Sequence, residues 1–598
     1  MNIIGISGLH HSVGFKKREF PGLPSRNYRI AQGFDSAAAL VNHGEVLAGA
    51  AEERFTGDKA TGAFPVHAIR YCLQAGNLKP EQVDYVAHGF SYEPFKAFFD
   101  EEEYRRKQYA EVYSPEVQKG LIEQHFPSAN WDGKFVPVLH HLAHAASAFF
   151  LSGFEEALIM VSDGMGEVHS MTMAVGRGSD IQVLKQIPAL HSLGTFYGVF
   201  TLYLGFYMGL DEYKVMGLAP YGNPRRHYER LMEFVRLKND GTYAIPIFAR
   251  DQTLSERETH AGVMRFLVEQ FGPAREPDSE ITQDHKDIAA ALQAVLQTCQ
   301  IHVLRHFRKE TGQSNLCLAG GVALNCSANG VIKRSRLFQN MFVQPAAGDD
   351  GTSLGAALYT QRQLDAGFKP RRMSLPLWGP EFGEDEMKQA LSERPDCKSA
   401  KYESFDSVCQ DIATRLDQGQ IVAWFQGRME FGPRALGSRS ILADPRDPTM
   451  RDRINQLVKK REAFRPFAPV VAKEAAARFF DIQTGEEDTY AHMLFVMPVR
   501  PAFRDKLPAI THVDGSARAQ TVARDHNPRL WQLLNEFEKR SGLPILLNTS
   551  FNVKGQPIVC TPKEALDTFL FAKLDVLVLG DYVVVPRLKI VAQASGLR

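Results

Sequence analysis

The chain has 598 residues, too many for one hydrophobic core, so we expect at least two domains. Hydrophobic residues make up 44% and charged residues 23%, as in folded globular proteins, which excludes a disordered or fibrous chain. Lys and Arg together number 69, as do Asp and Glu, and this balance argues against a protein that coats nucleic acid or an anionic membrane.

The seven cysteines are scattered and form no C-x-x-C pair. This pattern is typical of reduced thiols in a cytoplasmic enzyme, not of a disulfide framework or a structural zinc site. The amino-terminal MNIIGISGLHH lacks the basic segment and apolar stretch of a signal peptide, and no run of 18 apolar residues is present. We therefore expect a soluble, cytoplasmic protein.

The patterns of the first part of the chain alternate between strands and helices. A strand over 2–7, a polar loop over 8–33 and a hairpin of 36–41 and 46–51 resemble the start of actin-like folds. Helices are predicted at 64–75, within 101–126, from 140 onward and at 287–310, strands at 83–88, 136–138, 157–162 and 316–319, and a turn at 163–164. This alternation predicts α/β layers around a mostly parallel sheet that binds ligands at the carboxyl ends of its strands. No internal sequence repeat is visible.

The stretch 366–383 is rich in Pro, Gly and aromatic residues and has no periodicity, which marks a domain boundary. We expect a first domain over 1–370 and a second over 385–598. The second pattern is again α/β, with helices predicted at 406–418, 529–539 and 562–571 and strands at 421–425, 544–547 and 576–579.

Histidines and aspartates predict a metal site in the first domain. His140 and His144 are four residues apart, on one face of a predicted helix, a spacing at which two imidazoles can share an ion. Asp163 ends an apolar strand, and the pair Asp349-Asp350 follows another. Two nitrogen and two oxygen donors suit Fe²⁺, Mn²⁺ or Zn²⁺, with ordinary buried or surface histidines as the alternative.

A glycine turn predicts a nucleotide site in the same domain. Gly320 and Gly321 follow a strand and would let a phosphate approach the backbone, and Asn325 lies at the start of the next helix, where N–H groups attract anions. Lys214 is a further candidate for this site. The alternatives are a tightly packed turn and, for Lys214, an ion pair with Glu212 on a packed helix.

A basic stretch distinguishes the second domain. Between 428 and 465, ten Lys and Arg residues stand against five Asp and Glu residues. Because the cations lie among rigid and apolar residues, as in FGPRALGSRS and REAFRPFAP, we expect inward-facing guanidinium groups that need anionic partners, and phosphate matches their geometry. Arg518 and the small polar residues of 548–552 extend this predicted phosphate pocket, for which a solvated charged face is the alternative.

The chain resembles the O-carbamoyltransferases of antibiotic, toxin and nodulation-factor biosynthesis, the NodU/CmcH type that includes the tobramycin and ansamycin carbamoyltransferases. The resemblance covers nearly the whole chain. Its motifs, in order, are EERF at 52–55, HHLAHAASAF at 140–149, DGMGE at 163–167, EYKVMGLAPYG at 212–222, AGGVALNC at 319–326, GDDG at 348–351, FGPRALGSRSILADPR at 431–446, FRPFAPVV at 464–471, THVDGSARAQTV at 511–522 and NTSFN at 548–552.

The resemblance implies an α/β fold in which an amino-terminal actin-like (ASKHA, TsaD-like) double domain precedes a carboxy-terminal YrdC-like α/β domain. The YrdC-like domain would form carbamoyl-adenylate from carbamoyl phosphate and ATP with Mg²⁺, and the TsaD-like domain would transfer the carbamoyl group to a hydroxyl of a small-molecule natural product. We expect neither nucleic acid nor a membrane as a partner. The resemblance leaves undecided whether the chain forms a homodimer.

The same motifs imply residue roles. The metal, Fe²⁺ in this family, would be held by His140, His144, Asp163 and Asp350. Carbamoyl phosphate and ATP would be bound in the second domain by Arg434, Arg439, Lys459, Arg465, Arg518 and Ser550. Catalytic roles would fall to His140, Asp163, Arg434 and Lys459.

The chain departs from the family pattern on the expected acceptor side. Phe34-Asp35 replaces the usual His-Asp, and Lys59 stands where a His often follows EER. The motifs therefore do not assign the residue that transfers the proton, and His10 and His11 are candidates for this role. The sequence does not identify the acceptor. Alternative functions are a tRNA threonylcarbamoylation-type transferase, which the zero net charge disfavours, and an actin-like ATP-binding kinase or scaffold.

Overall fold

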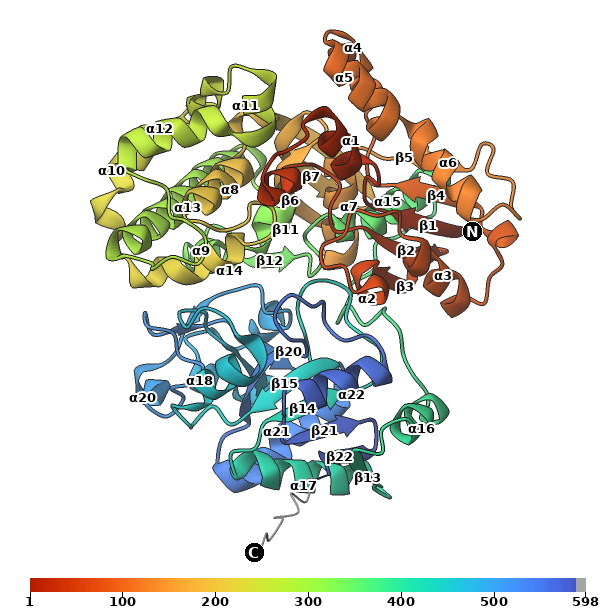
Figure 1. Cartoon of the computed structure of the whole chain (residues 1–598), viewed down its shortest axis with the longest axis vertical. Coiled ribbons are helices and arrows are strands. Elements are labelled where there is room, and N and C mark those ends of the chain that lie inside the picture. Colours follow the sequence, from red (N-terminus) through yellow and green to blue (C-terminus); the bar gives the residue numbers. More distant parts are fainter. Residues whose placement is uncertain (588–598) are drawn as a thin grey trace, which may run out of the picture.

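The computed structural model describes residues 1–587 and contains two sheets of identical topology in its amino-terminal region (Figure 1). The first has the order β3-β2-β1-β4-β5, with β1 (Asn2–Ile6), β2 (Ala37–Asn42), β3 (Glu45–Ala51), β4 (Tyr85–His88) and β5 (Phe135–Pro137). The second has the order β8-β7-β6-β11-β12, with β6 (Glu156–Gly166), β7 (His169–Arg177), β8 (Asp180–Pro188), β11 (Asn315–Ala319) and β12 (Asn340–Val343).

Strand directions repeat as well. In each sheet an antiparallel three-strand meander continues into two parallel strands. This duplication is the actin-like double domain expected from the sequence. The expectation of a mostly parallel sheet was wrong, because the meanders supply half of the strand pairs and short turns suffice to join antiparallel strands.

Two helices fill the space between these sheets and position the candidate metal site. Helix α7 (His140–Ser152) packs on β6 and β11, helix α15 (Asp350–Leu364) packs on β1 and β2, and the two helices contact each other. Glycine makes the close packing possible, since a Cβ on Gly355 would lie 1.7 Å from the carbonyl oxygen of Ala143.

The remaining helices of this region lie outside the sheets. They are α1 (Ser12–Glu19), α2 (Glu53–Thr56), α3 (Val66–Ala75), α4 (Lys96–Asp100), α5 (Glu103–Gln108), α6 (Pro115–His125), α8 (Leu193–Tyr203), α9 (Glu212–Leu218), α10 (Tyr228–Met232), α11 (Leu254–Thr259), α12 (Ala261–Phe271), α13 (Gln283–Thr311) and α14 (Cys326–Arg334), with a small hairpin of β9 (Arg236–Leu237) and β10 (Tyr243–Ala244). Helices α4 and α5 form a projecting arm (Figure 1).

Two sequence predictions differ locally from the structure. The turn predicted at Asp163-Gly164 lies inside β6, which continues to Gly166. The loop 8–33 contains α1, because the buried Lys16 ties it down by donating to the carbonyl oxygens of Ile30 and Glu258.

The carboxy-terminal region is built on one eight-stranded sheet of order β13-β22-β21-β14-β15-β20-β16-β19, in which β14–β21 and β16–β19 are the parallel pairs. Its strands are β13 (Cys397–Lys401), β14 (Val422–Phe425), β15 (Arg439–Ala443), β16 (Ala468–Ala472), β19 (Gln520–Val522), β20 (Ile545–Ser550), β21 (Val576–Leu579) and β22 (Tyr582–Pro586). Its helices are α16 (Glu384–Ser392), α17 (Phe405–Asp417), α18 (Met450–Ile454), α19 (Ala476–Phe479), α20 (Pro501–Arg504), α21 (Pro528–Ser541) and α22 (Pro562–Phe571), and β17 (Met497–Pro498) pairs with β18 (Ser516–Ala517).

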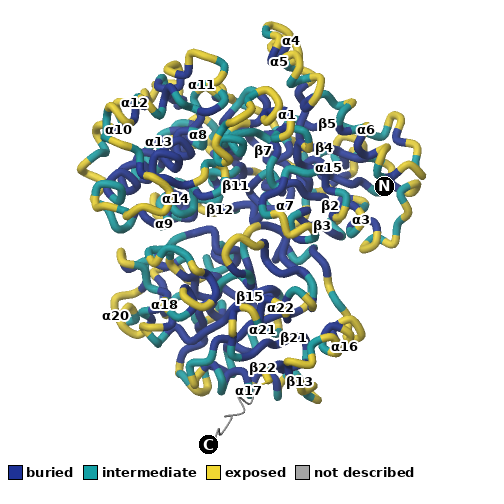
Figure 2. Tube along the Cα trace, in the orientation of Figure 1, coloured by how far each residue is buried: buried dark blue, intermediate teal, exposed yellow. Residues whose placement is uncertain are grey.

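Both regions have buried interiors (Figure 2), and they pack against each other through specific contacts. Arg54 donates to the carbonyl oxygen of Gly432 at 3.0 Å, and Asn329 donates to that of Leu494 at 2.9 Å. Within residues 1–587, no helix combines the length and apolar character needed to cross a membrane.

Candidate metal centre and phosphate pocket

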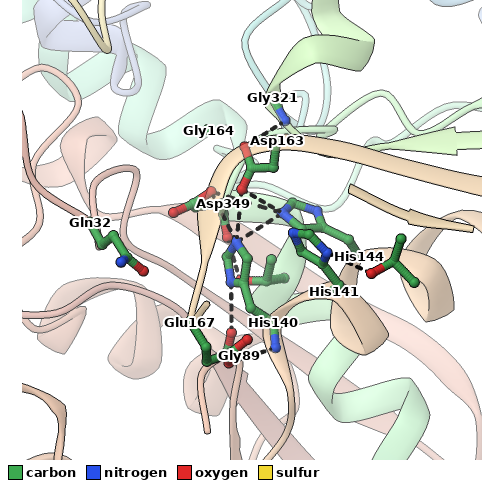
Figure 3. A network of polar contacts seen from close by, with 12 residues as sticks. Gln32, Gly89, His140, His141, His144, Asp163, Gly164, Glu167, Gly321 and Asp349 are labelled. Carbon is green, nitrogen blue, oxygen red and sulfur yellow. Dashed lines mark hydrogen bonds and ion pairs between the residues drawn. The ribbon is translucent and has the colours of Figure 1, made fainter. Parts of the chain in front are cut away.

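Four side chains with metal-ligating atoms meet between the two amino-terminal sheets: His140, His144, Asp163 and Asp349 (Figure 3). Their ligand atoms all lie within 4.8 Å of one another. The Nε2 atom of His140 is 3.1 Å from Nε2 of His144, 3.2 Å from Oδ2 of Asp163 and 3.5 Å from Oδ1 of Asp349. Both imidazoles are buried, whereas the Asp349 side chain is 21% exposed, so the cluster is accessible from the Asp349 side.

Three different elements place these residues. Helix α7 begins at His140 and carries both histidines one turn apart, β6 carries Asp163, and Asp349 directly precedes α15. The Nδ1 atom of His140 donates to the carbonyl oxygen of Gly89 at 2.9 Å, which leaves the lone pair of Nε2 directed at the cluster. Asp163 is held from the other side, where its Oδ1 accepts the N–H of Gly321 at 3.1 Å.

The donor set fits a divalent metal ion. Two imidazole nitrogens face each other at 3.1 Å with two carboxylates beside them, and the buried Nδ1 of His144 has no hydrogen-bond partner among residues 1–587. Burial by itself would raise the pKa of Asp163, but the hydrogen bond to His140 and the neighbouring imidazoles hold this pKa well below its usual value. An ionised carboxylate with two buried imidazoles is a mixed N/O site of the kind that binds first-row divalent ions.

The structure differs from the sequence assignment at the fourth ligand. Asp350 is the first residue of α15, and its Oδ1 accepts the N–H of Gly351 at 2.9 Å. It lies among Asp35, Glu53 and Arg54, where burial, with Glu53 among the neighbouring charges, raises its pKa to about 7. Consecutive residues of a helical turn point about 100° apart, so only one of the two aspartates faces the imidazoles.

A second cluster, the cation cluster, consists of Arg434, Lys459, Arg461, Arg465 and Arg518. Burial, followed by the charges of Arg461 and Arg465, lowers the pKa of Lys459 well below its usual value. Burial and the nearby Arg518 likewise lower the pKa of Arg434. Cations this close to one another need an anionic partner, as a phosphate pocket requires.

Acceptor groups fix the centre of the cation cluster. The Nζ of Lys459 donates to the carbonyl oxygen of Ser550 at 2.6 Å and to Oδ1 of Asn552 at 2.7 Å. The hydroxyl of Ser550 also accepts from Lys459, at 3.2 Å, and donates to Asn552 at 2.7 Å. The NTSFN motif therefore orients the lysine.

Arg439 lies apart from the cation cluster. It is fully buried, and its guanidinium donates to the carbonyl oxygens of Pro380, Gln426, Gly427 and Ser438 while it stacks on Phe425 at 3.6 Å. Its two terminal NH₂ groups hold these loops together where the basic segment turns back into the β14–β15 hairpin, while its buried Nε has no hydrogen-bond partner within residues 1–587.

The amino-terminal region contributes residues to the cation cluster that the sequence did not assign. The guanidinium of Arg465 stacks on Tyr213 at 4.6 Å and pairs with Glu462 at 3.5 Å. Glu462 also pairs with Lys214 at 3.3 Å, and the charge of Lys59 lowers the pKa of Lys459. The EYK motif was the available signal, but its contact with a segment about 250 residues away cannot be derived from spacing.

The predicted nucleotide residues of the amino-terminal region separate into two places. Gly320 has φ +87°, and a Cβ there would lie 2.3 Å from the carbonyl oxygen of Ser162, while Gly321 donates to Asp163. Asn325 caps α14 by accepting the N–H of Ala328 at 3.0 Å. Lys214 instead lies at the boundary between the regions, paired with Asp211 and Glu462.

Two family models match the chain. The model described as Carbamoyltransferase N-terminus matches residues 30–358, and the one described as Carbamoyltransferase C-terminus matches residues 413–585. The nodulation protein NolNO of Sinorhizobium fredii is 41% identical over 92% of this chain and 79% of its own length. The nodulation protein NolO of Bradyrhizobium diazoefficiens is 44% identical over 74% of this chain and 78% of its own length.

Among solved structures, (R)-2-hydroxyglutaryl-CoA dehydratase component A of Acidaminococcus fermentans is similar at a TM-score of 0.30 and 15% identity, over 61% of this chain and 98% of that one. A score this low adds nothing to the topology described above. The two family models and the two nodulation proteins agree with the motifs, and on these grounds the chain belongs to the carbamoyltransferase family and is a carbamoyltransferase.

Proposed function

We propose that this carbamoyltransferase is an ATP-dependent O-carbamoyltransferase that works in two steps. The domain of residues 385–598 forms carbamoyl-adenylate with the help of Mg²⁺: water hydrolyses carbamoyl phosphate to carbamate and phosphate, and the carbamate oxygen then attacks the α-phosphorus of ATP and displaces pyrophosphate. The domain of residues 1–370 transfers the carbamoyl group to a hydroxyl of a small-molecule acceptor. The observation that carries the proposal is the cation cluster, which lies where Tyr213 and Lys214 of the first domain meet Arg465 and Glu462 of the second.

Adenylate formation brings several phosphate groups together. Their mutual repulsion has to be offset by preorganised cations, which also stabilise the charge of the leaving phosphates. Arg434, Arg465 and Arg518 bind the phosphates in this proposal, and Lys459 supports the reacting phosphate. Because Ser550 and Asn552 already hold the ammonium group of Lys459, the group does not have to be ordered when substrate binds.

The transfer site is the cluster of His140, His144, Asp163 and Asp349, which would hold a divalent ion, Fe²⁺ by family resemblance. Such an ion supplies a Lewis acid that polarises a carbonyl oxygen. The protein keeps one face of the cluster closed, since Phe90 stacks on His140 at 4.1 Å and the histidines are buried. The acceptor then approaches from the partly exposed Asp349 side.

Pyrophosphate exchange tests the first step. We expect the chain to exchange labelled pyrophosphate into ATP only when carbamoyl phosphate is present, which a kinase or an ATP-binding scaffold would not do. Lys459→Met or Arg434→Ala should lower the exchange rate about 100-fold or more, the cost of losing a preorganised charge-stabilising group. His140→Ala should leave exchange largely intact, because it lies in the transfer site.

The control for Lys459→Met is Lys460→Met, since Lys460 is its exposed neighbour and its ammonium group lies 5.6 Å from the ring centre of Phe571. It should exchange pyrophosphate at the wild-type rate. Retained exchange in Lys459→Met and Arg434→Ala would contradict the assignment of the cation cluster. Exchange without carbamoyl phosphate would contradict the proposed reaction itself.

A further inference from the structure

The tip of the hairpin between β6 and β7 presses against the histidines of α7. A Cβ on Gly166 would lie 2.6 Å from Cδ2 of His140 and 2.8 Å from Cδ2 of His141, so only glycine allows this approach. The next residue, Glu167, is 5% exposed and has φ +50°, in the left-handed region that favours glycine. A non-glycine residue in this conformation strains the backbone, so the surrounding contacts must hold it in place.

The carboxylate of Glu167 caps the helix that carries both histidines. Its Oε1 accepts the backbone N–H of His140, the first residue of α7, at 2.9 Å. The preceding residue, Leu139, provides no side-chain cap. A carboxylate at a helix N-terminus satisfies a free N–H group and interacts favourably with the helix dipole.

The same oxygen atom holds a second segment against His140. Oε1 of Glu167 also accepts the N–H of Ser91 at 2.9 Å. The two residues before Ser91 both contact the His140 ring: the carbonyl oxygen of Gly89 accepts from Nδ1 at 2.9 Å, and Phe90 stacks on the ring at 4.1 Å and 15°. Figure 3 shows Glu167 and Gly89 on the side of His140 that faces away from Asp163.

We propose that Glu167 is a positioning residue of the metal site. It clamps the segment 89–91 to the start of α7 and thereby fixes the His140 tautomer with Nε2 directed at the ion. Since the hairpin also carries Asp163, this one element places three of the four candidate ligands, Asp163 directly and the two histidines through α7. The inference rests on the divalent-metal site of the proposed function, but not on the adenylation chemistry.

Titration of the purified full-length chain with Co²⁺, followed by calorimetry and by the visible absorption of the bound ion, tests this role. We expect Glu167→Ala to weaken Co²⁺ binding about 10–100-fold, the usual cost of removing a group that orients a metal ligand, and to change the absorption spectrum. Glu167→Gln should stay close to wild type, because its amide oxygen can still accept both N–H groups. Rescue by this isosteric variant separates positioning from general structural damage.

Thr172→Val is the matched control. Thr172 contacts the buried His141 at 2.8 Å from the same hairpin, but His141 is not among the four clustered ligands. This variant should bind Co²⁺ like wild type. A loss as large as that of Glu167→Ala would overturn the proposal, since any disturbance of the hairpin would then suffice.

Two further results would overturn the inference. One is wild-type affinity and spectrum in a folded Glu167→Ala variant, and the other is a Glu167→Gln variant as weak as Glu167→Ala. If Glu167→Ala does not fold, Glu167→Asp takes its place in the test. Because its shorter side chain cannot hold both N–H groups, Glu167→Asp should bind Co²⁺ more weakly than Glu167→Gln. Wild-type affinity in both of these variants would overturn the proposed clamp. If the wild-type chain binds no Co²⁺, the proposed metal site itself is wrong. This outcome differs from one in which the site binds metal but Glu167 does not position it.

Discussion

Asp349 and Asp350 are neighbours in the chain but lie in different environments. Oδ1 of Asp349 is 3.5 Å from Nε2 of His140 and 3.9 Å from Nε2 of His144. Asp350 accepts the N–H of Gly351 and lies with Asp35 and Glu53, where its pKa is raised. One aspartate is therefore available to a metal ion, whereas the other lies in a separate buried network.

Asparagine substitutions separate the two aspartates. We expect Asp349→Asn to weaken Co²⁺ binding by more than about 100-fold, because loss of a direct ligand should exceed the 10–100-fold cost of an outer-shell change. Asp350→Asn, which is equally isosteric, should leave the affinity unchanged and serves as the control. Calorimetric titration measures both. The opposite ranking would show that Asp350 turns toward the histidines when metal binds.

Residue-level predictions from the sequence depended on whether a local spacing carried the information. His140 and His144 could be grouped from helical periodicity, and the structure brings them together with Asp163. Periodicity could not choose between two adjacent aspartates, since that depends on the exact start of α15. The contact between Tyr213 and Arg465 could not be predicted from the sequence either, because it arises from packing between segments that are far apart in the chain.

At the scale of elements, α9 begins with a glutamate that burial disfavours as an ion. Oε1 of Glu212 accepts the N–H of Gly209 at 2.6 Å, and burial raises the pKa of Glu212 to about 7. In the unfolded chain this carboxyl ionises near pH 4.5. Between these two values the folded chain binds more protons than the unfolded chain, so the contribution of Glu212 to stability is full below pH 4.5 and is lost as the pH rises through 7.

Glu212→Gln should remove this pH dependence. The amide keeps an oxygen for Gly209 but cannot ionise, so above pH 7 the variant should be more stable by up to about 3.5 kcal/mol, at about 1.4 kcal/mol per pKa unit. Thermal denaturation at pH 5 and pH 8 measures the effect, with the larger gain expected at pH 8. The control is Glu229→Gln, an exposed glutamate in the first turn of α10. Equal gains at both pH values would contradict the role of ionisation.

Elements with strong periodicity could be predicted, and those set by tertiary contacts could not. Helix α22 has the predicted bounds, and a capping box and a proline mark its first turn in the sequence. The extension of β6 through Asp163 was missed, since Asp-Gly is a common turn sequence, whereas here the strand continues through an irregularity and pairs with β7 again at Gly166. Helix α1 was hidden in a polar segment that the buried Lys16 anchors.

At the scale of the whole molecule, the two five-stranded sheets have the same topology although no repeat is visible in the sequence. Topology needs only alternating apolar strands and connections, which many unrelated sequences supply. The junction between the regions was equally hidden. Ala328 and Ile332 of α14 belong to the same buried cluster as Leu494 and Phe495 of the carboxy-terminal region, so the two regions share part of one core.

Gly330 lies on α14 at this junction. A Cβ there would be 2.3 Å from the carbonyl oxygen of Val496, an atom that also accepts from Arg334 at 2.7 Å. The backbone of one region thus contacts a helix of the other directly, and no side chain can be accommodated without a shift of the two regions.

We expect the wild-type chain to unfold in one calorimetric transition, because the two regions share part of one core. Gly330→Ala should loosen the junction, since overpacking of this kind costs about 1–3 kcal/mol. We therefore expect this variant to unfold in two separate transitions, the first at a lower temperature than the transition of the wild-type chain. Gly120→Ala is the control: Gly120 is also helical, but a Cβ there meets no atom of the described residues 1–587 within 4 Å, so this change should stabilise the chain by about 0.5–1 kcal/mol. If Gly330→Ala instead melts in one transition at the wild-type temperature, the two regions are not coupled through α14.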